Sequence, residues 1–342
     1  MTIKAEEADD RWATQFASRI GDPHYEAVRL QLEVALAERA DEEGWDADMT
    51  ATLRAAALGV GPDSWLDVLF QEAIKEVSLD DETMSLYFVQ IPAAGLNGFA
   101  LRAPATGTPV IVLNHGLVAY VGHAMHMMLG LTGMTGTPYC AHHPPEVFLR
   151  DLVALADGVA AHVPAFMLAL KSPECFSDHG GIANELHHAL CTIAELFVIF
   201  HELGHVVLRH HDAGDVRAVT IDTAGGLAID VDVLNQAQRQ ELEADRFAFE
   251  ALVAMNADTG LEVRDIAFAA GCLFAFMHVG ELRAAVHEFD SHPSAFQRWE
   301  HLRSIAGRQD KNSWTNSIDY FYKWWSEGDS AIVELLGRPD SD

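Results

Sequence analysis

Apolar residues recur at helical spacing along most of this chain, and strand-like sequence is confined to one short region. Residues 26–39 and 65–76 each read as an amphipathic helix. Three short apolar runs, at 86–91, 98–102 and 110–113, read as strands joined by turn-forming residues. From residue 116 onwards nearly every element is predicted to be helical. The pattern therefore predicts an α+β fold that is mostly helical, with one small sheet.

The second half of the chain is predicted to hold a series of helices separated by glycine and proline. The longest begins at Ile182, and Ala213 with Gly214 supplies a stop signal just beyond its predicted end. The next helix follows the N-cap residue Asn235. The predicted helices span about residues 116–131, 146–170 (with a break near Pro164), 182–211, 236–255, 265–287 and 291–305. The aromatic residues of 314–336 are interpreted as core packing.

These elements divide the chain into three predicted regions. Residues 1–80 form an N-terminal helical region. Residues 81–310 form the main domain, with a helical insertion at about residues 120–181. Residues 311–342 form a helical tail rich in aromatic side chains. The 342 residues suffice for a large apolar core.

The charge balance narrows the classes of partner. The formal net charge is -29, with only 22 lysines and arginines and no basic cluster. Such a surface repels phosphate backbones, so we do not expect the protein to bind nucleic acid. The acidity favours a solubility role over an adaptation to salt, although composition does not separate the two.

The cysteines and the apolar runs indicate the cellular compartment in which the protein is expected. None of the four cysteines forms a C-x-x-C pair, which is typical of reduced thiols. The N-terminus lacks the apolar core of a signal peptide, and no uncharged apolar run reaches the ~18 residues of a membrane span. We expect a cytoplasmic protein without a membrane span, of unknown oligomeric state.

The motif His-Glu-x-x-His lies inside the long apolar helix. His201 and His205 are one helical turn apart, so both side chains project from one face. Zn²⁺ accepts two imidazole nitrogens in this arrangement, and Glu202 is then placed to take a proton from water. The plainer interpretation is that both histidines are buried core residues with hydrogen-bond partners, and that the glutamate between them has no function.

A hydrolytic zinc site needs a third protein ligand, and two positions compete for that role. His211 has the metzincin spacing, but Leu208 replaces the glycine that lets a metzincin helix turn back. Glu241 and Asp245 share a face of the next helix, so one can reach the metal while the other orients a ligating histidine. Glu243, on another face, is expected to be solvated. His210 and His211 are interpreted as polar residues at a helix C-terminus.

Four segments resemble, in the same order, the gluzincin metallopeptidases of the HtpX, CAAX prenyl protease and BepA group. They are Asn97–Leu101, Val110–Leu117, the zinc motif with Glu-x-x-Ala-Asp-x-Phe-Ala at 241–248, and Ser291–Arg298. The chain departs from that group in the roughly 80 residues between the second segment and the zinc motif, in Gly98, and in lacking flanking transmembrane helices. Its layout is therefore also similar to the soluble Lit-type or ImmA-type peptidases.

The resemblance implies a zincin-like fold and a role for each matching residue. Glu241 would be the third zinc ligand, and Asp245 would support a ligating histidine. The strand ending in Gly116-Leu117 would lie at the edge of the sheet and hold a peptide substrate by backbone pairing. His292 would lie close to the active site, and Arg298 would be structural.

The sequence thus predicts a zinc metallopeptidase, a metalloendopeptidase acting on polypeptides. Glu202 would be the general base, and His292 would help to stabilise the oxyanion. The alternative is a catalytically silent or autoinhibited sensor or interaction module, with its zinc closed off by His292. Hydrolysis of non-peptide amides also stays open, and the substrate itself is not predicted.

Overall fold

The computed structural model describes twelve helices and strands together with a few separate residues. The described residues are 34, 37, 38, 40, 41, 44, 65–77, 86–91, 98–103, 106–114, 116–132, 145–160, 182–210, 221–222, 228–229, 236–257, 259–284 and 293–309. The chain divides into two compact units, Met1–Tyr120 with Gly158–Lys171 and Val121–Asp157 with Ser172–Asp342.

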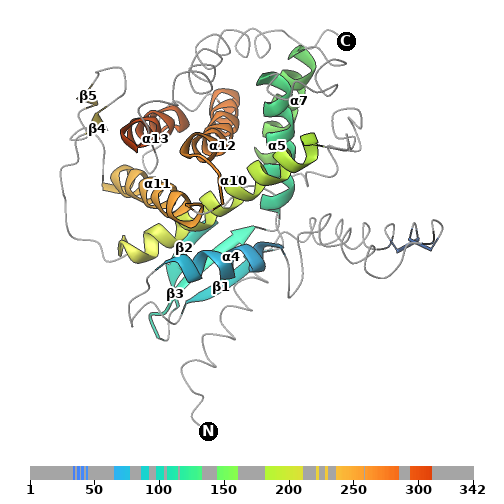
Figure 1. Ribbon diagram of the computed structural model, residues 1–342. Coiled ribbons are helices and arrows are strands. Elements are labelled where there is room, and N and C mark those ends of the chain that lie inside the picture. The colour runs from blue at the N-terminus through green and yellow to red at the C-terminus, as the bar shows by residue number, and fades with distance from the viewer. Residues whose placement is uncertain are drawn as a thin grey trace. The chain divides into compact units, whose positions relative to one another are not determined.

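The first unit contains a three-stranded sheet and helix α4 (Trp65–Glu76). The strands are β1 (Tyr87–Ile91), β2 (Gly98–Arg102) and β3 (Pro109–Asn114), in the order β1-β3-β2. Strand β3 pairs in parallel with β1 and antiparallel with β2. Phe70 of α4 stacks on Phe88 of β1 with ring centroids 4.3 Å apart, so α4 covers one face of the sheet (Figure 1). All three predicted strands are confirmed.

The expectation that the strand ending in Gly116-Leu117 lies at the sheet edge is wrong. That strand is β3, which is buried throughout and lies between the two other strands. A continuous apolar run such as Val110–Leu113 suits a strand covered on both faces. Because β1 and β2 already use its backbone groups, β3 cannot pair with a substrate peptide.

The second unit is helical apart from one short strand pair. Its helices are α5 (Gly116–Thr132, of which the first five residues fall in the first unit), α7 (Pro145–Ala160, whose last residues do likewise), α10 (Ile182–Val207), α11 (Gln236–Met255), α12 (Val263–Ala284) and α13 (Ala295–Gln309). Strands β4 (Ile221–Asp222) and β5 (Ala228–Ile229) form an antiparallel pair. The described residues thus confirm the mostly helical α+β prediction.

Helices α10 to α13 form the core of this unit (Figure 1). Phe197 of α10 meets Phe274 of α12 edge to face, with centroids 5.7 Å apart. Trp299 of α13 is fully buried against α12 at Gly271, where a Cβ would lie 2.9 Å from the indole ring. These contacts bury apolar faces of three helices together, which is the dominant source of stability for such a bundle.

Helices α10 and α11 lie close together at Gly204. A Cβ at this position would lie 3.2 Å from the Cα of Ala244 and 3.1 Å from the Phe247 ring. The absence of a side chain therefore lets the two backbones approach at this point. Since Gly204 stands between Glu202 and His205, this approach also fixes the distance from the motif to α11.

The end of α10 differs from the prediction. The helix stops at Val207, and Leu208–His210 form a turn in which Arg209 has a φ of 56°. A left-handed residue ends a helix by redirecting the chain, and here it does so before the stop signal that Ala213 and Gly214 suggested. Both of those residues lie outside the described ones.

Two helices of this unit contain windows long and apolar enough to cross a membrane, at His187–Val207 and Val263–Leu282. Of the residues in these windows, 78% and 67% respectively are buried inside the protein. Buried core helices commonly pass this test, so it is weak evidence for a span.

Two of the predicted regions fall largely outside the described residues. The tail at 311–342 does so entirely, and so does most of the N-terminal region at 1–80. The predicted region boundaries, including the insertion at about 120–181, stay predictions.

Candidate metal centre

Three side chains from two helices converge on one point in the second unit. The Nε2 atoms of His201 and His205 on α10 lie 3.1 Å apart. The carboxylate of Glu241 on α11 reaches both, with Oε2 at 3.3 Å from His201 Nε2 and Oε1 at 3.4 Å from His205 Nε2. One ligand atom from each residue lies within 4.8 Å of the others, so the group could hold a metal ion. These are the three residues that the sequence predicts as ligands.

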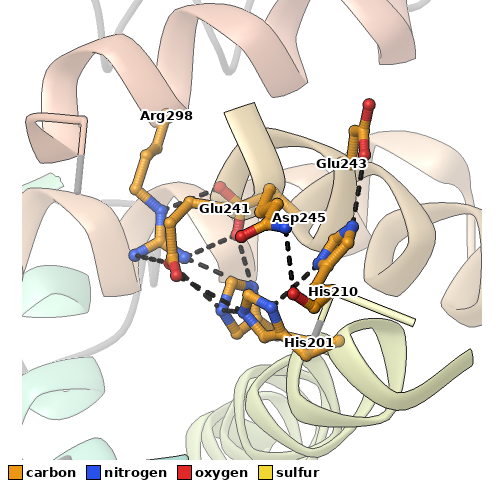
Figure 2. Close-up of polar contacts among 8 residues, drawn as sticks. His201, His210, Glu241, Glu243, Asp245 and Arg298 are labelled. Carbon is orange, nitrogen blue, oxygen red and sulfur yellow. Dashed lines mark hydrogen bonds and ion pairs between the residues drawn. The ribbon is translucent and has the colours of Figure 1, made fainter. Parts of the chain in front are cut away.

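Asp245 and Arg298 support the first histidine. The Nδ1 atom of His201 lies 2.9 Å from Asp245 Oδ1, and this contact assigns the imidazole proton to Nδ1 (Figure 2). Asp245 is fully buried and accepts two further hydrogen bonds from Arg298, at 2.8 Å from Nε and 2.5 Å from Nη2. Its contact with His201 is the one expected of a carboxylate that orients a metal-binding imidazole.

The resemblance implies only a structural role for Arg298, and the sequence does not predict its ion pair with Asp245. Arg298 comes from α13, and its Nη1 also lies 3.8 Å from Glu241 Oε2. Its guanidinium carbon lies 4.9 Å from the centroid of the Phe274 ring. The only signal in the sequence was the segment Ser291–Arg298, because nothing local connects an arginine to a carboxylate on another helix.

The charges in this cluster shift one another's pKa values. Burial alone raises the pKa of Asp245, but the charge and hydrogen bonds of Arg298, together with His201, lower it to about 2. Burial alone lowers the pKa of His201, yet its hydrogen bonds to Asp245 and Glu241 raise it to about 9. Burial raises the pKa of Glu202, an effect that the positive charges of the two histidines partly offset.

The donor set and the charge balance both fit a divalent metal ion. Glu202, Glu241 and Asp245 are buried acids, and Arg298 is the buried base that faces all three. A histidine that binds metal must be neutral, and with neutral histidines and ionised carboxylates these three acids and Arg298 would sum to two negative charges. An unbalanced buried charge is costly, and a divalent cation restores neutrality. Two imidazole nitrogens and one carboxylate are also a ligand set that leaves a position open.

Other predicted site residues have different outcomes. Glu202 is 6% exposed and lies close enough to His201, His205, Glu241 and Arg298 to interact with their charges. His292 and His211 lie outside the described residues, so their predicted roles stay predictions.

Glu243 is partly solvated, as the sequence predicts, but it also contacts a histidine that the sequence did not connect to it. Glu243 is 42% exposed, but its Oε2 lies 3.2 Å from Nε2 of His210. His210 in turn places its Nδ1 2.9 Å from Nδ1 of His205. The turn after α10 brings His210 back towards the motif, which a straight helix to residue 211 would not have done.

A comparison with known families gives one match. The family Peptidase U49 matches residues 164–317, a stretch that contains α10 to α13 and every residue of the metal centre. The match supports a peptidase, and hence a polypeptide substrate. It does not bear on the resemblance to the gluzincin group. No curated protein and no solved structure gives a significant match.

Proposed function

We propose that the protein is a zinc-dependent metallopeptidase with a zincin-like fold, as the sequence predicts. The observation that carries the proposal is the convergence of His201, His205 and Glu241 beside the buried carboxylate of Glu202. The family match over the same stretch supports the peptidase part. Two imidazoles and a carboxylate favour Zn²⁺ among the common metals.

The residues of this chain would hold and support the ion. His201 and His205 present their Nε2 atoms, and Glu241 presents its carboxylate. When bound, zinc would supply the Lewis acidity that polarises a peptide carbonyl and makes water acidic enough to react near neutral pH. Asp245 would keep the proton of His201 on Nδ1, so that the lone pair of Nε2 stays directed into the centre.

Glu202 would carry the proton transfers. It takes a proton from water as the oxygen adds to the scissile carbonyl carbon, and it delivers that proton to the leaving amine nitrogen. Hydrolysis then adds one water across the peptide bond, giving a carboxyl and an amino terminus. Burial makes the Glu202 carboxylate a stronger base than an exposed glutamate, which suits this role.

The test is a Glu202→Gln variant of the full chain, assayed on unfolded casein carrying a fluorophore. Zinc content should match that of the wild type, and hydrolysis should fall by about 10²-fold or more. Glu250→Gln is the matched control, because Glu250 lies on the exposed face of α11 and pairs with Arg246. Cleavage by Glu202→Gln at the wild-type rate would show that Glu202 is not the base.

A further inference from the structure

Helix α10 ends in a turn that folds the chain back onto the motif. The N–H of Arg209 donates to the carbonyl of Val206 at 3.1 Å, and the N–H of His210 donates to the carbonyl of His205 at 3.0 Å. These two bonds, with a left-handed residue between them, form a Schellman motif. Glycine usually occupies the left-handed position, but here it is Arg209, with a φ of 56°. L-residues rarely adopt such a conformation, which is held where surrounding contacts over-determine it.

The contacts that follow from this turn are polar. In a Schellman motif the residue after the left-handed position usually makes an apolar contact with the residue five positions earlier. Here these residues are His210 and His205, and their Nδ1 atoms lie 2.9 Å apart. The His210 side chain is 6% exposed, its Nε2 lies 3.2 Å from Glu243 Oε2, and its carbonyl accepts a hydrogen bond from Gln240.

One placement of the protons satisfies this chain of contacts. A metal ion held between Nε2 of His205 and Glu241 would take the Nε2 lone pair, so the proton of His205 would lie on Nδ1 and be donated to Nδ1 of His210. The proton of His210 then lies on Nε2 and is donated to the carboxylate of Glu243. Figure 2 shows the contact between the His210 ring and the Glu243 carboxylate. Each motif histidine is thus backed by a carboxylate, His201 directly by Asp245 and His205 through an intervening imidazole.

We propose that His210 and Glu243 are positioning residues for His205, and that they fix the tautomer and the ring orientation in which it binds metal. The proposal rests on the metal centre of the proposed function. The plainer alternative is that His210 only packs beneath the motif and ends the helix. The two differ in what the ring nitrogens of His210 do, and not in the volume that the ring fills.

The variants His210→Phe and Glu243→Gln test this difference. Phenylalanine keeps an aromatic ring in the turn but removes both nitrogens, and glutamine keeps the shape of the glutamate but removes its charge. The measurement is the zinc dissociation constant of the full chain, by competition with a chromophoric chelator. We expect zinc affinity to fall roughly tenfold or more in His210→Phe, and less in Glu243→Gln because that carboxylate is partly exposed. The double variant should bind zinc as His210→Phe does, since both changes break one chain of hydrogen bonds.

Two controls separate this effect from loss of the turn. Arg209→Gly keeps the left-handed position and should bind zinc like the wild type. Thermal unfolding of each metal-free variant shows whether the fold is intact, and a His205 Nδ1 proton signal in the ¹⁵N spectrum of the zinc-bound protein reports the tautomer directly.

Wild-type zinc affinity in both His210→Phe and Glu243→Gln overturns the positioning role and leaves the proposed function standing. If the wild-type chain binds no zinc, the proposed function fails and the positioning role fails with it.

Discussion

Replacing Asp245 with asparagine should destabilise the metal-free protein by about 3 kcal/mol, because it leaves Arg298 buried without its main counterion. Asp245 is fully buried and accepts two hydrogen bonds from the guanidinium and one from His201. Breaking a buried ion pair from one side costs about 3–5 kcal/mol. The lower end applies here because Glu241 Oε2, 3.8 Å from Arg298 Nη1, still faces the guanidinium.

The pKa of Asp245 gives a second measure of the same interaction. The pKa falls from 3.8 to about 2, which corresponds to about 2 kcal/mol at neutral pH. Because the folded-state pKa is lowered, this contribution is fully present above pH 4 and is lost as the pH falls through about 2. The comparison of variants therefore belongs at pH 7, where the carboxylate is ionised in both the folded and the unfolded state.

A double variant that lacks both charges shows whether the destabilisation comes from the unpaired guanidinium or from lost packing. Methionine at position 298 keeps an unbranched stem that can pack on Phe274, which the guanidinium contacts in the wild type. The Asp245→Asn, Arg298→Met double variant should recover at least about 2 kcal/mol relative to Asp245→Asn alone.

The assay is equilibrium unfolding in urea with a chelator present, followed by far-ultraviolet circular dichroism. Glu250→Gln breaks the exposed Arg246–Glu250 pair and should change the free energy of unfolding by less than about 0.5 kcal/mol. A cost below about 1 kcal/mol for Asp245→Asn would refute the reasoning. So would a double variant whose loss equals the sum of the two single losses, because a pair that interacts cannot be additive.

Three further outcomes follow from the packing and burial of single residues. In Gly204→Ala the new Cβ lies 3.2 Å from the Cα of Ala244, so α11 must move and zinc affinity should fall roughly tenfold, as measured by chelator competition. Gly271→Ala meets the Trp299 ring at 2.9 Å and should cost about 1–3 kcal/mol in urea unfolding, with zinc affinity unchanged. Burial lowers the pKa of His123 from 6.5 to about 4, and the charge of His187 adds to this effect. Because the unfolded chain then takes up a proton that the folded protein does not, the free energy of unfolding should fall by at most about 3 kcal/mol as the pH drops from 6.5 to 4. His123→Gln should flatten that stretch of the pH profile, and an unchanged slope would contradict the assignment.

Local spacing was enough to predict the parts of the site that lie on one element. His201 and His205 share a helical face because four residues nearly complete one turn. The same rule places Glu241 and Asp245 together on α11, whose predicted bounds, 236–255, are those observed. Which carboxylate faced the metal was open from spacing alone, and the structure directs Glu241 to both Nε2 atoms and Asp245 to Nδ1 of His201.

Features that depend on backbone conformation or on pairing between distant segments were not predicted. The turn after Val207 depends on Arg209 in a left-handed conformation, for which arginine gives no compositional signal. The position of β3 between two strands is a matter of long-range pairing, and the resemblance alone had suggested an edge. Arg298 lies 53 residues from Asp245, so the sequence shows both charges without showing that they meet.

The glycine inside His-Glu-x-x-His connects the local and the long-range parts of the site. Glu202 and His205, on either side of it in the motif, are the proposed base and a candidate ligand, whereas Gly204 carries no functional group. Yet the gap between the motif and Glu241 depends on how closely α10 approaches α11, and at Gly204 there is little room for a side chain beside Ala244. A bulkier residue there would leave the spacing of the two histidines intact while moving the carboxylate away from both. The motif therefore specifies two candidate ligands through helical periodicity and the position of the third candidate through the small residue between them.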